Sequence, residues 1–191
     1  STTSSITVSP GTTTNYNVTV TSPEGCVTTG SVTINVYPNP VLTISSSATE
    51  ICNGGSANIS VTSSLSGTTY QWSNGSTSSS ITVGPTSTTT YTVTGTSANG
   101  CTGTASIQIT VNPLPIVNVT ATSRDICVGE SSTITATSNI SGSTFLWSNG
   151  STTSSITVSP GTTTNYNVTV TSPEGCVTTG SVTINVYPNP V

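Results

Sequence analysis

Apolar and polar residues alternate along most of this chain, in short runs separated by turn residues. Around position 60, for example, Ile59 and Val61 alternate with Asn58 and Ser60. This period of two predicts a strand with one buried face. Runs of the same kind occur at residues 42–44, 70–72, 81–83, 91–93 and 107–111. Six or seven short strands, Asn-Gly turns and no helical period are typical of a two-sheet β-sandwich.

The strand pattern is repeated along the chain. Residues 151–191 are identical to residues 1–41, and the offset of 150 divides into two gapless units of 75. We therefore interpret residues 1–41 as the C-terminal half of one repeat, followed by whole repeats at 42–116 and 117–191. The repeats are expected to stack end to end as a rod, and the chain to be an internal segment of a longer protein.

Composition removes several classes of function. Only 3% of the residues are charged and the net charge is −4, so there is no basic surface for nucleic acid. No apolar run approaches the ~20 residues that cross a bilayer. We expect neither nucleic-acid binding nor membrane insertion.

Catalytic and metal-binding chemistry have almost no candidate residues. The chain has no His and no Lys, and its one Arg is Arg124. Serine is abundant, but no general base accompanies it. Five dispersed acids cannot gather the carboxylates that calcium sites generally use: Glu24, Glu50, Asp125, Glu130 and Glu174. We expect no enzyme activity, no metal and no cofactor.

The large aromatic residues fit the core better than a binding surface. Trp72 and Trp147 occupy equivalent strand positions in the two whole repeats, and Tyr91 and Tyr166 each open a later strand. We interpret all four as core residues. The alternative for the tryptophans is a sugar-stacking platform, which would leave at least one of them exposed.

Short proline-rich segments join the repeats. The segments at 36–44 and 111–119 carry Pro38, Pro40, Pro113 and Pro115. Proline fixes its own φ and favours an extended conformation in the preceding residue. We therefore expect stiff junctions with neighbouring repeats as partners.

Five cysteines without histidine indicate structural disulfides in an oxidising compartment outside the cytosol. Pairing within each repeat would join Cys52 to Cys101 and Cys127 to Cys176. In a standard sandwich, however, those positions lie at opposite poles, farther apart than the ~7 Å that a disulfide spans between Cα atoms. When repeats stack, the first pole of one meets the second pole of the next. We favour an inter-domain Cys52–Cys176 bond.

In that arrangement the three remaining cysteines would pair with neighbours outside this chain: Cys26, Cys101 and Cys127. The intra-domain pairing stays open as the alternative, because an irregular first strand could bring Cys52 to the other pole.

The order of motifs resembles a known family of repeats. Each whole repeat has IC-x-G-x-S, then WSNGST, an I-T-V-x-P strand and a late GC. Before that GC, residues 117–191 carry TT-x-x-Y-x-V-T, which reads ST-x-x-Y-x-V-T in residues 42–116. This order is similar to the PKD-like and immunoglobulin-like repeats of very large Bacteroidota surface proteins, including gliding adhesins exported by the type 9 secretion system. The resemblance implies an immunoglobulin-like fold and a surface or secreted filament, and it implies no catalytic residues.

Together these features favour an extracellular structural stalk. The alternative is a binding module that recognises a glycan or another surface through Thr and Ser rows or loop aromatics. Lateral self-association of copies into a filament is a third hypothesis, since neutral Thr-rich faces would permit it.

Overall fold

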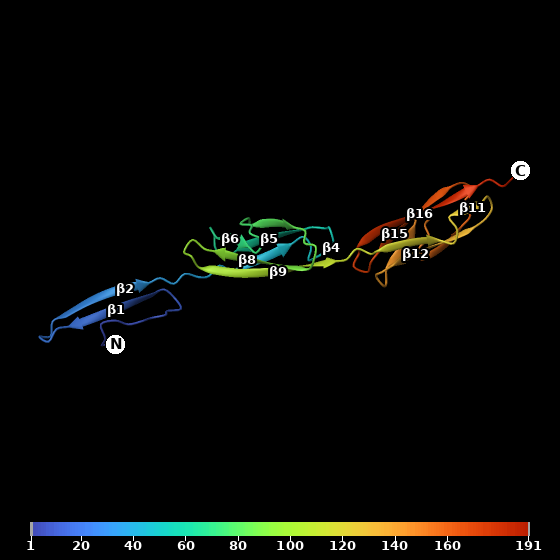
Figure 1. Ribbon diagram of the computed structural model, residues 1–191. Coiled ribbons are helices and arrows are strands. Elements are labelled where there is room, and N and C mark those ends of the chain that lie inside the picture. Colours follow the sequence, from blue (N-terminus) through green and yellow to red (C-terminus); the bar gives the residue numbers. More distant parts are fainter. Residues whose placement is uncertain (1, 191) are drawn as a thin grey trace. The chain divides into compact units, whose positions relative to one another are not determined.

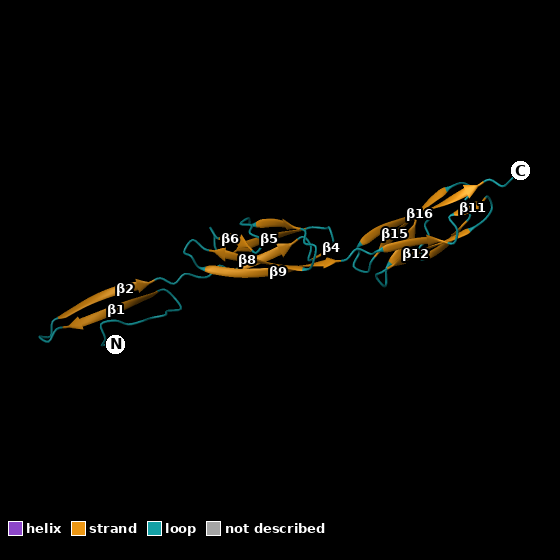
Figure 2. Cartoon of the chain, in the orientation of Figure 1, coloured by secondary structure: helices purple, strands orange, loops and turns teal. Residues whose placement is uncertain are grey.

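The computed structural model describes residues 2–190, and strands, turns and loops make up all of that range (Figure 2). The chain divides into two compact units, which we describe separately. Unit 1 comprises Ser1–Ser46, Ile59–Ile81 and Tyr91–Ile107, and unit 2 comprises Ser47–Asn58, Thr82–Thr90 and Gln108–Val191. Ser1 and Val191, the outer ends of the sequence repeats 1–41 and 117–191, lie outside the described residues.

Residues 117–190 of unit 2 form two sheets facing one core (Figure 1). The strands are β10 (Val117–Ala121), β11 (Asp125–Cys127), β12 (Ser132–Ser138), β13 (Thr144–Trp147), β14 (Ser155–Val158), β15 (Thr164–Thr171) and β16 (Val177–Tyr187). One sheet has the order β10-β12-β14 and the other β11-β16-β15-β13. The short β11 pairs parallel to the end of β16, and the other pairs are antiparallel.

The core of this sandwich takes every second residue from its strands. In β15 Val168 and Val170 are buried, and in β16 Val182 and Ile184 are buried. β11 and β13 of the same sheet add Ile126 and Trp147, and the other sheet contributes the facing side chains: Ile134, Ala136, Ile156 and Val158. Removing such apolar surface from water is the main favourable contribution to folding.

Residues 42–116 repeat the same strand order. The strands are β3 (Leu42–Ser46), β4 (Glu50–Cys52), β5 (Ala57–Ser63), β6 (Thr69–Trp72), β7 (Ser80–Val83), β8 (Thr89–Thr96) and β9 (Thr102–Asn112). Their sheets are β3-β5-β7 and β4-β9-β8-β6, and β4 pairs parallel to the end of β9. The alternation of the sequence is again the alternation of burial, as in β5 and β8.

Residues 14–34, at the start of unit 1, form a hairpin of β1 (Thr14–Thr21) and β2 (Val27–Ile34). This hairpin has the same sequence and the same register as the pairing of β15 with β16. The burial differs: Val18, Val20 and Val32 are exposed in β1 and β2, whereas their counterparts in β15 and β16 are buried.

Candidate functional site

The junction between the two whole repeats lies within unit 2 and is short. Strand β9 ends at Asn112 and β10 begins at Val117, so only four residues connect them. Pro115 is fully buried. The next residue is fixed by a side chain, because the Asn139 Oδ1 accepts a hydrogen bond from the Ile116 N–H at 2.6 Å. Proline thus fixes one φ of the connection, and a hydrogen bond engages the amide that follows it.

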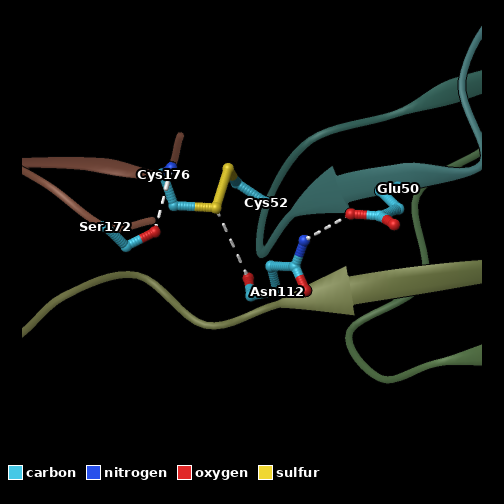
Figure 3. The surroundings of a disulfide bond; sticks show 5 residues. All are labelled: Glu50, Cys52, Asn112, Ser172 and Cys176. Atoms are coloured by element: carbon cyan, nitrogen blue, oxygen red, sulfur yellow. Dashed lines mark hydrogen bonds between the residues drawn. A yellow bond between two sulfur atoms is a disulfide. The ribbon is translucent and has the colours of Figure 1, made fainter. Parts of the chain in front are cut away.

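A disulfide crosses this junction. Cys52, at the end of β4, is bonded to Cys176, which follows the β15–β16 turn, with a Cα–Cα distance of 5.6 Å (Figure 3). The two positions are 124 residues apart in the sequence. The bond therefore joins the residue 42–116 repeat to the residue 117–191 repeat, and Cys52 does not pair with Cys101.

On the Cys52 side of the disulfide, the main-chain oxygen of Asn112 contacts both the backbone and the sulfur. The Asn112 oxygen accepts a hydrogen bond from the Asn53 N–H at 2.9 Å and lies 3.9 Å from Cys176 Sγ. The Asn112 side chain donates to Glu50 Oε2 at 3.3 Å (Figure 3). The parallel pairing of β4 with β9 sets this geometry, since it places Cys52 opposite Asn112.

The turn on the other side holds Cys176 in place. The Cys176 N–H donates to Ser172 Oγ at 3.2 Å, and the Ser172 N–H donates to the Cys176 oxygen at 2.8 Å. Gly175 has a φ of 84°, in the left-handed region that glycine adopts without steric cost. Cys176 itself is 0% exposed.

The other cysteines carry no disulfide within residues 2–190. Cys26 and Cys127 are exposed, and Cys101 is half-buried. Cys101 has surroundings like those of Cys176: its Sγ lies 3.7 Å from the Tyr37 oxygen, and its N–H donates to Ser97 Oγ at 3.2 Å.

The junction at residues 36–44, within unit 1, is also closely packed. Pro40 is buried, and its oxygen occupies the space that a β-carbon on Gly103 would need. The Val41 N–H donates to Ser64 Oγ at 3.0 Å. Pro38 and Pro113, the first prolines of the two junctions, are exposed.

The four aromatic residues singled out in the sequence lie at or near the core. Trp72 and Trp147 are each 2% exposed, Tyr91 is buried, and Tyr166 is half-buried against the core of residues 117–190. Each indole N–H donates at 2.8 Å to a backbone oxygen, at Ser78 for Trp72 and at Thr153 for Trp147. Neither indole is a surface platform for a sugar.

The acidic side chains accept hydrogen bonds from groups close to them in space. Asp125 Oδ1 accepts from the Asn185 amide at 2.8 Å and from the Tyr187 hydroxyl at 3.3 Å, and Glu130 Oε2 accepts from the Cys127 N–H at 2.8 Å. A hydrogen bond from Ser22 lowers the pKa of the exposed Glu24 carboxyl. No group of three or more potential metal ligands occurs between residues 2 and 190.

Sequence reasoning missed Asn112 and Gly103. Asn112 could not be identified from the sequence, because its main-chain oxygen, and not its side chain, contacts the Cys176 sulfur. The signal for Gly103 was its difference from Thr178 at the equivalent position of the next repeat.

The protein is all-β and consists of tandem immunoglobulin-like sandwich domains. Residues 38–113 match a family model described as "Ig-like domain CHU_C associated". No curated protein matches the chain.

Among solved structures, the chain is similar to that titled "Ca2+-stabilized adhesin helps an Antarctic bacterium reach out and bind ice". The identity is 22% and the TM-score 0.45, covering 94% of this chain and 58% of that one. It is also similar to a 1.5-MDa bacterial ice-binding adhesin, at 20% identity and TM-score 0.38, with coverages of 92% and 74%. For murine CEACAM1b the identity is 15% and the TM-score 0.39, with coverages of 77% and 100%.

Residues 2–190 contain no helix that is long and apolar enough to span a membrane.

Proposed function

We propose that this chain is a structural spacer of a long extracellular surface adhesin or filament, in which short proline junctions and disulfides fix neighbouring repeats to one another. The observation that carries the proposal is the Cys52–Cys176 bond, because it ties two sequence repeats together next to their peptide connection. A catalytic or ligand site gains nothing from a cross-link at that place. A load-bearing connection gains a second covalent attachment.

The disulfide also supports the location. Disulfides form and persist in oxidising compartments and are rare in the cytosol. An extracellular position, on a cell surface or in a secreted filament, supplies that condition. The motif order extends the proposal to the Bacteroidota adhesins exported by the type 9 secretion system.

The proposal includes the remaining cysteines. If every junction is built alike, each cysteine equivalent to Cys52 bonds the cysteine equivalent to Cys176 in the following repeat. Cys101, Cys127 and Cys26 would then pair with cysteines that lie outside residues 1–191. The burial of both tryptophans favours this spacer over the alternative of a module that binds glycan through aromatic platforms.

Residual dipolar couplings of the oxidised chain test the proposal. Amides of residues 42–116 and of residues 117–190 are expected to fit one alignment tensor, because the peptide and the disulfide attach the repeats at two places. In the Cys52→Ser variant the two sets should need separate tensors. Cys101→Ser is the matched control, since that thiol carries no bond here, and should leave the common tensor unchanged. Separate tensors in the oxidised parent chain would refute a rigid spacer.

A further inference from the structure

Four asparagines of the chain are followed directly by glycine: Asn53, Asn74, Asn99 and Asn149. In such a pair, the main-chain nitrogen of the glycine can attack the carbonyl carbon of the asparagine side chain. Glycine permits this attack because it has no side chain to block the approach. The reaction releases ammonia and is a spontaneous modification of the protein. The sequence makes the four pairs equal candidates for it, but their backbone hydrogen bonds differ.

Three of the four glycines use their N–H to close a tight turn. In each of these turns the glycine N–H donates to the backbone oxygen three residues earlier, at 2.9 Å. The donors and acceptors are Gly75 and Trp72, Gly100 and Ser97, and Gly150 and Trp147. A hydrogen-bonded amide loses its proton less readily, and the bond holds the nitrogen within the turn. Attack on the neighbouring side chain then requires the turn to open.

The turn at Asn53 is shifted by one residue relative to the other three. Its closing bond runs from the Gly55 N–H to the Cys52 oxygen at 2.8 Å, so Asn53 and Gly54 are its two middle residues. The φ of Gly54 is 86°, which suits the third position of a type II turn. The closing bond of such a turn does not use the N–H at that position. Among residues 2–190, the Gly54 N–H has no hydrogen-bond acceptor.

The Asn53–Gly54 pair is also open to water. Both residues are exposed, and beyond the adjoining residues no atom lies within 4 Å of a β-carbon position on Gly54. In Asn74 and Asn149 the side-chain oxygen accepts a hydrogen bond at 3.1 Å from the N–H two residues further on. The Asn53 side chain makes no hydrogen bond to any residue in the range 2–190. Both reacting groups of this pair are therefore free.

We propose that Asn53 is the preferred site of deamidation in the folded chain. The Gly54 nitrogen loses its proton to hydroxide and forms a bond to Asn53 Cγ. The bond between Cγ and the side-chain nitrogen breaks, and that nitrogen takes up a proton and leaves as ammonia. Water then adds to one of the two carbonyl groups of the succinimide ring. The ring opens to aspartate or isoaspartate, so the only reagent consumed is water.

The modification would change the backbone at the junction between the two whole repeats. Asn53 directly follows Cys52, which is bonded to Cys176, and its N–H donates to the Asn112 oxygen at 2.9 Å. In isoaspartate the main chain runs through the side-chain carbon, so one methylene is added between residues 53 and 54. A carboxylate also replaces a neutral amide. A lengthened turn and a new charge would therefore lie next to the disulfide.

The other whole repeat supplies a matched control for this turn. Val128 occupies the position equivalent to Asn53. The Glu130 N–H donates to the Cys127 oxygen at 3.0 Å, and Gly129 has a φ of 91°. The turn thus forms without asparagine. Asn53→Val is expected to keep the turn and to remove the only group there that can deamidate.

The test incubates the oxidised full chain in mildly alkaline buffer and follows each Asn-Gly pair by peptide mapping. Isoaspartate is identified by enzymatic methyl transfer from S-adenosylmethionine. Asn53 should convert about threefold or more faster than each of the other three asparagines, because their turns must first give up a hydrogen bond. The Asn53→Val chain should lose this early product and keep the slow ones.

The same measurement on the reduced chain in urea separates structure from sequence. Without turns the four pairs should convert at similar rates, since each has glycine after asparagine. In the folded chain, conversion of Asn53 no faster than that of Asn74, Asn99 and Asn149 would overturn the proposal. A lead of Asn53 that persists undiminished in urea would overturn it as well, because the lead would then come from the local sequence.

Discussion

Gly30 and Gly180 show how one residue type can carry different constraints in identical sequence. Both lie at the same position of the same 41-residue sequence. Only Gly180 has two valines of another strand closer than 3.0 Å to its β-carbon position. Its lack of a side chain is therefore a packing requirement in one copy and not in the other.

We expect Gly180→Ala to lower the free energy of unfolding by about 1–3 kcal/mol, because Val117 and Val119 must shift to admit the methyl group. Gly30→Ala should change it by less than about 0.5 kcal/mol, since its neighbours leave ordinary contact distances. Urea denaturation of the two variants and the parent chain measures both values. Equal losses in the two variants would contradict the packing argument.

Single residues were predictable where the alternation is strict. Trp72 follows Tyr70 by two positions in a run with polar Gln71 between them, and it is buried. The close packing around Gly103 could not be predicted from the alternation of apolar and polar residues. The atom that Gly103 faces, the Pro40 oxygen, comes from a distant part of the sequence.

At the scale of elements, the β13–β14 connection is held by its tryptophan. The Trp147 side chain is buried, and its indole N–H donates to the Thr153 oxygen in the loop before β14. The same contact joins Trp72 to Ser78 in the other whole repeat. The WSNGST motif thus fixes a turn and fills the core with one side chain.

Trp147→Phe should lower the free energy of unfolding by about 2–4 kcal/mol, because it leaves the Thr153 oxygen without its donor and opens a void. Chemical denaturation followed by circular dichroism measures the change. Leu146→Phe is the neighbouring control: Leu146 is exposed and its replacement should matter by less than about 0.5 kcal/mol. A loss of similar size in both variants would argue against the tryptophan contact.

The short parallel strands β4 and β11 were the elements hardest to predict from the sequence. Three residues do not establish an alternation, and a parallel partner lies at the far end of the repeat. In β4 the register of Cys52 with Asn112 places the cysteine at the junction. The pole argument from the sequence led to the same pair of cysteines, but it did not contain this strand.

At the scale of the whole molecule, the disulfide shortens the covalent path between the ends of the chain. It spans a sequence separation of 124 out of 191 residues. When the oxidised chain is unfolded by force, the residues between Cys52 and Cys176 form a closed loop and cannot extend. Only the remaining residues lengthen under load.

Pulling single molecules from their two ends should therefore give a fully unfolded length about 420 Å shorter for the oxidised chain than for the reduced chain, at ~3.4 Å for each of the bypassed residues. The Cys52→Ser variant should have the reduced length in either buffer, and Cys101→Ser should respond like the parent. Equal lengths of the oxidised and reduced parent chain would show that the Cys52–Cys176 bond does not form in solution.

The repeat organisation was readable from sequence because residues 151–191 copy residues 1–41. The relation between repeats was harder to read, since it depends on which ends of separate strands meet. The period of two in the sequence predicts which residues are buried within a sheet. The contacts of the Asn112 carbonyl and of the Cys176 turn are made by backbone groups, which every residue type has, so the sequence pattern does not reveal them.

The bond between Cys52 and Cys176 also changes what a protease can achieve. A single cut anywhere between those two residues opens a loop but leaves both products attached through sulfur. Severing the segment there requires reduction as well as hydrolysis. An extracellular thread with such bonds at its junctions would stay continuous after being nicked, so its working life would depend on the reductants around it as much as on its folding stability.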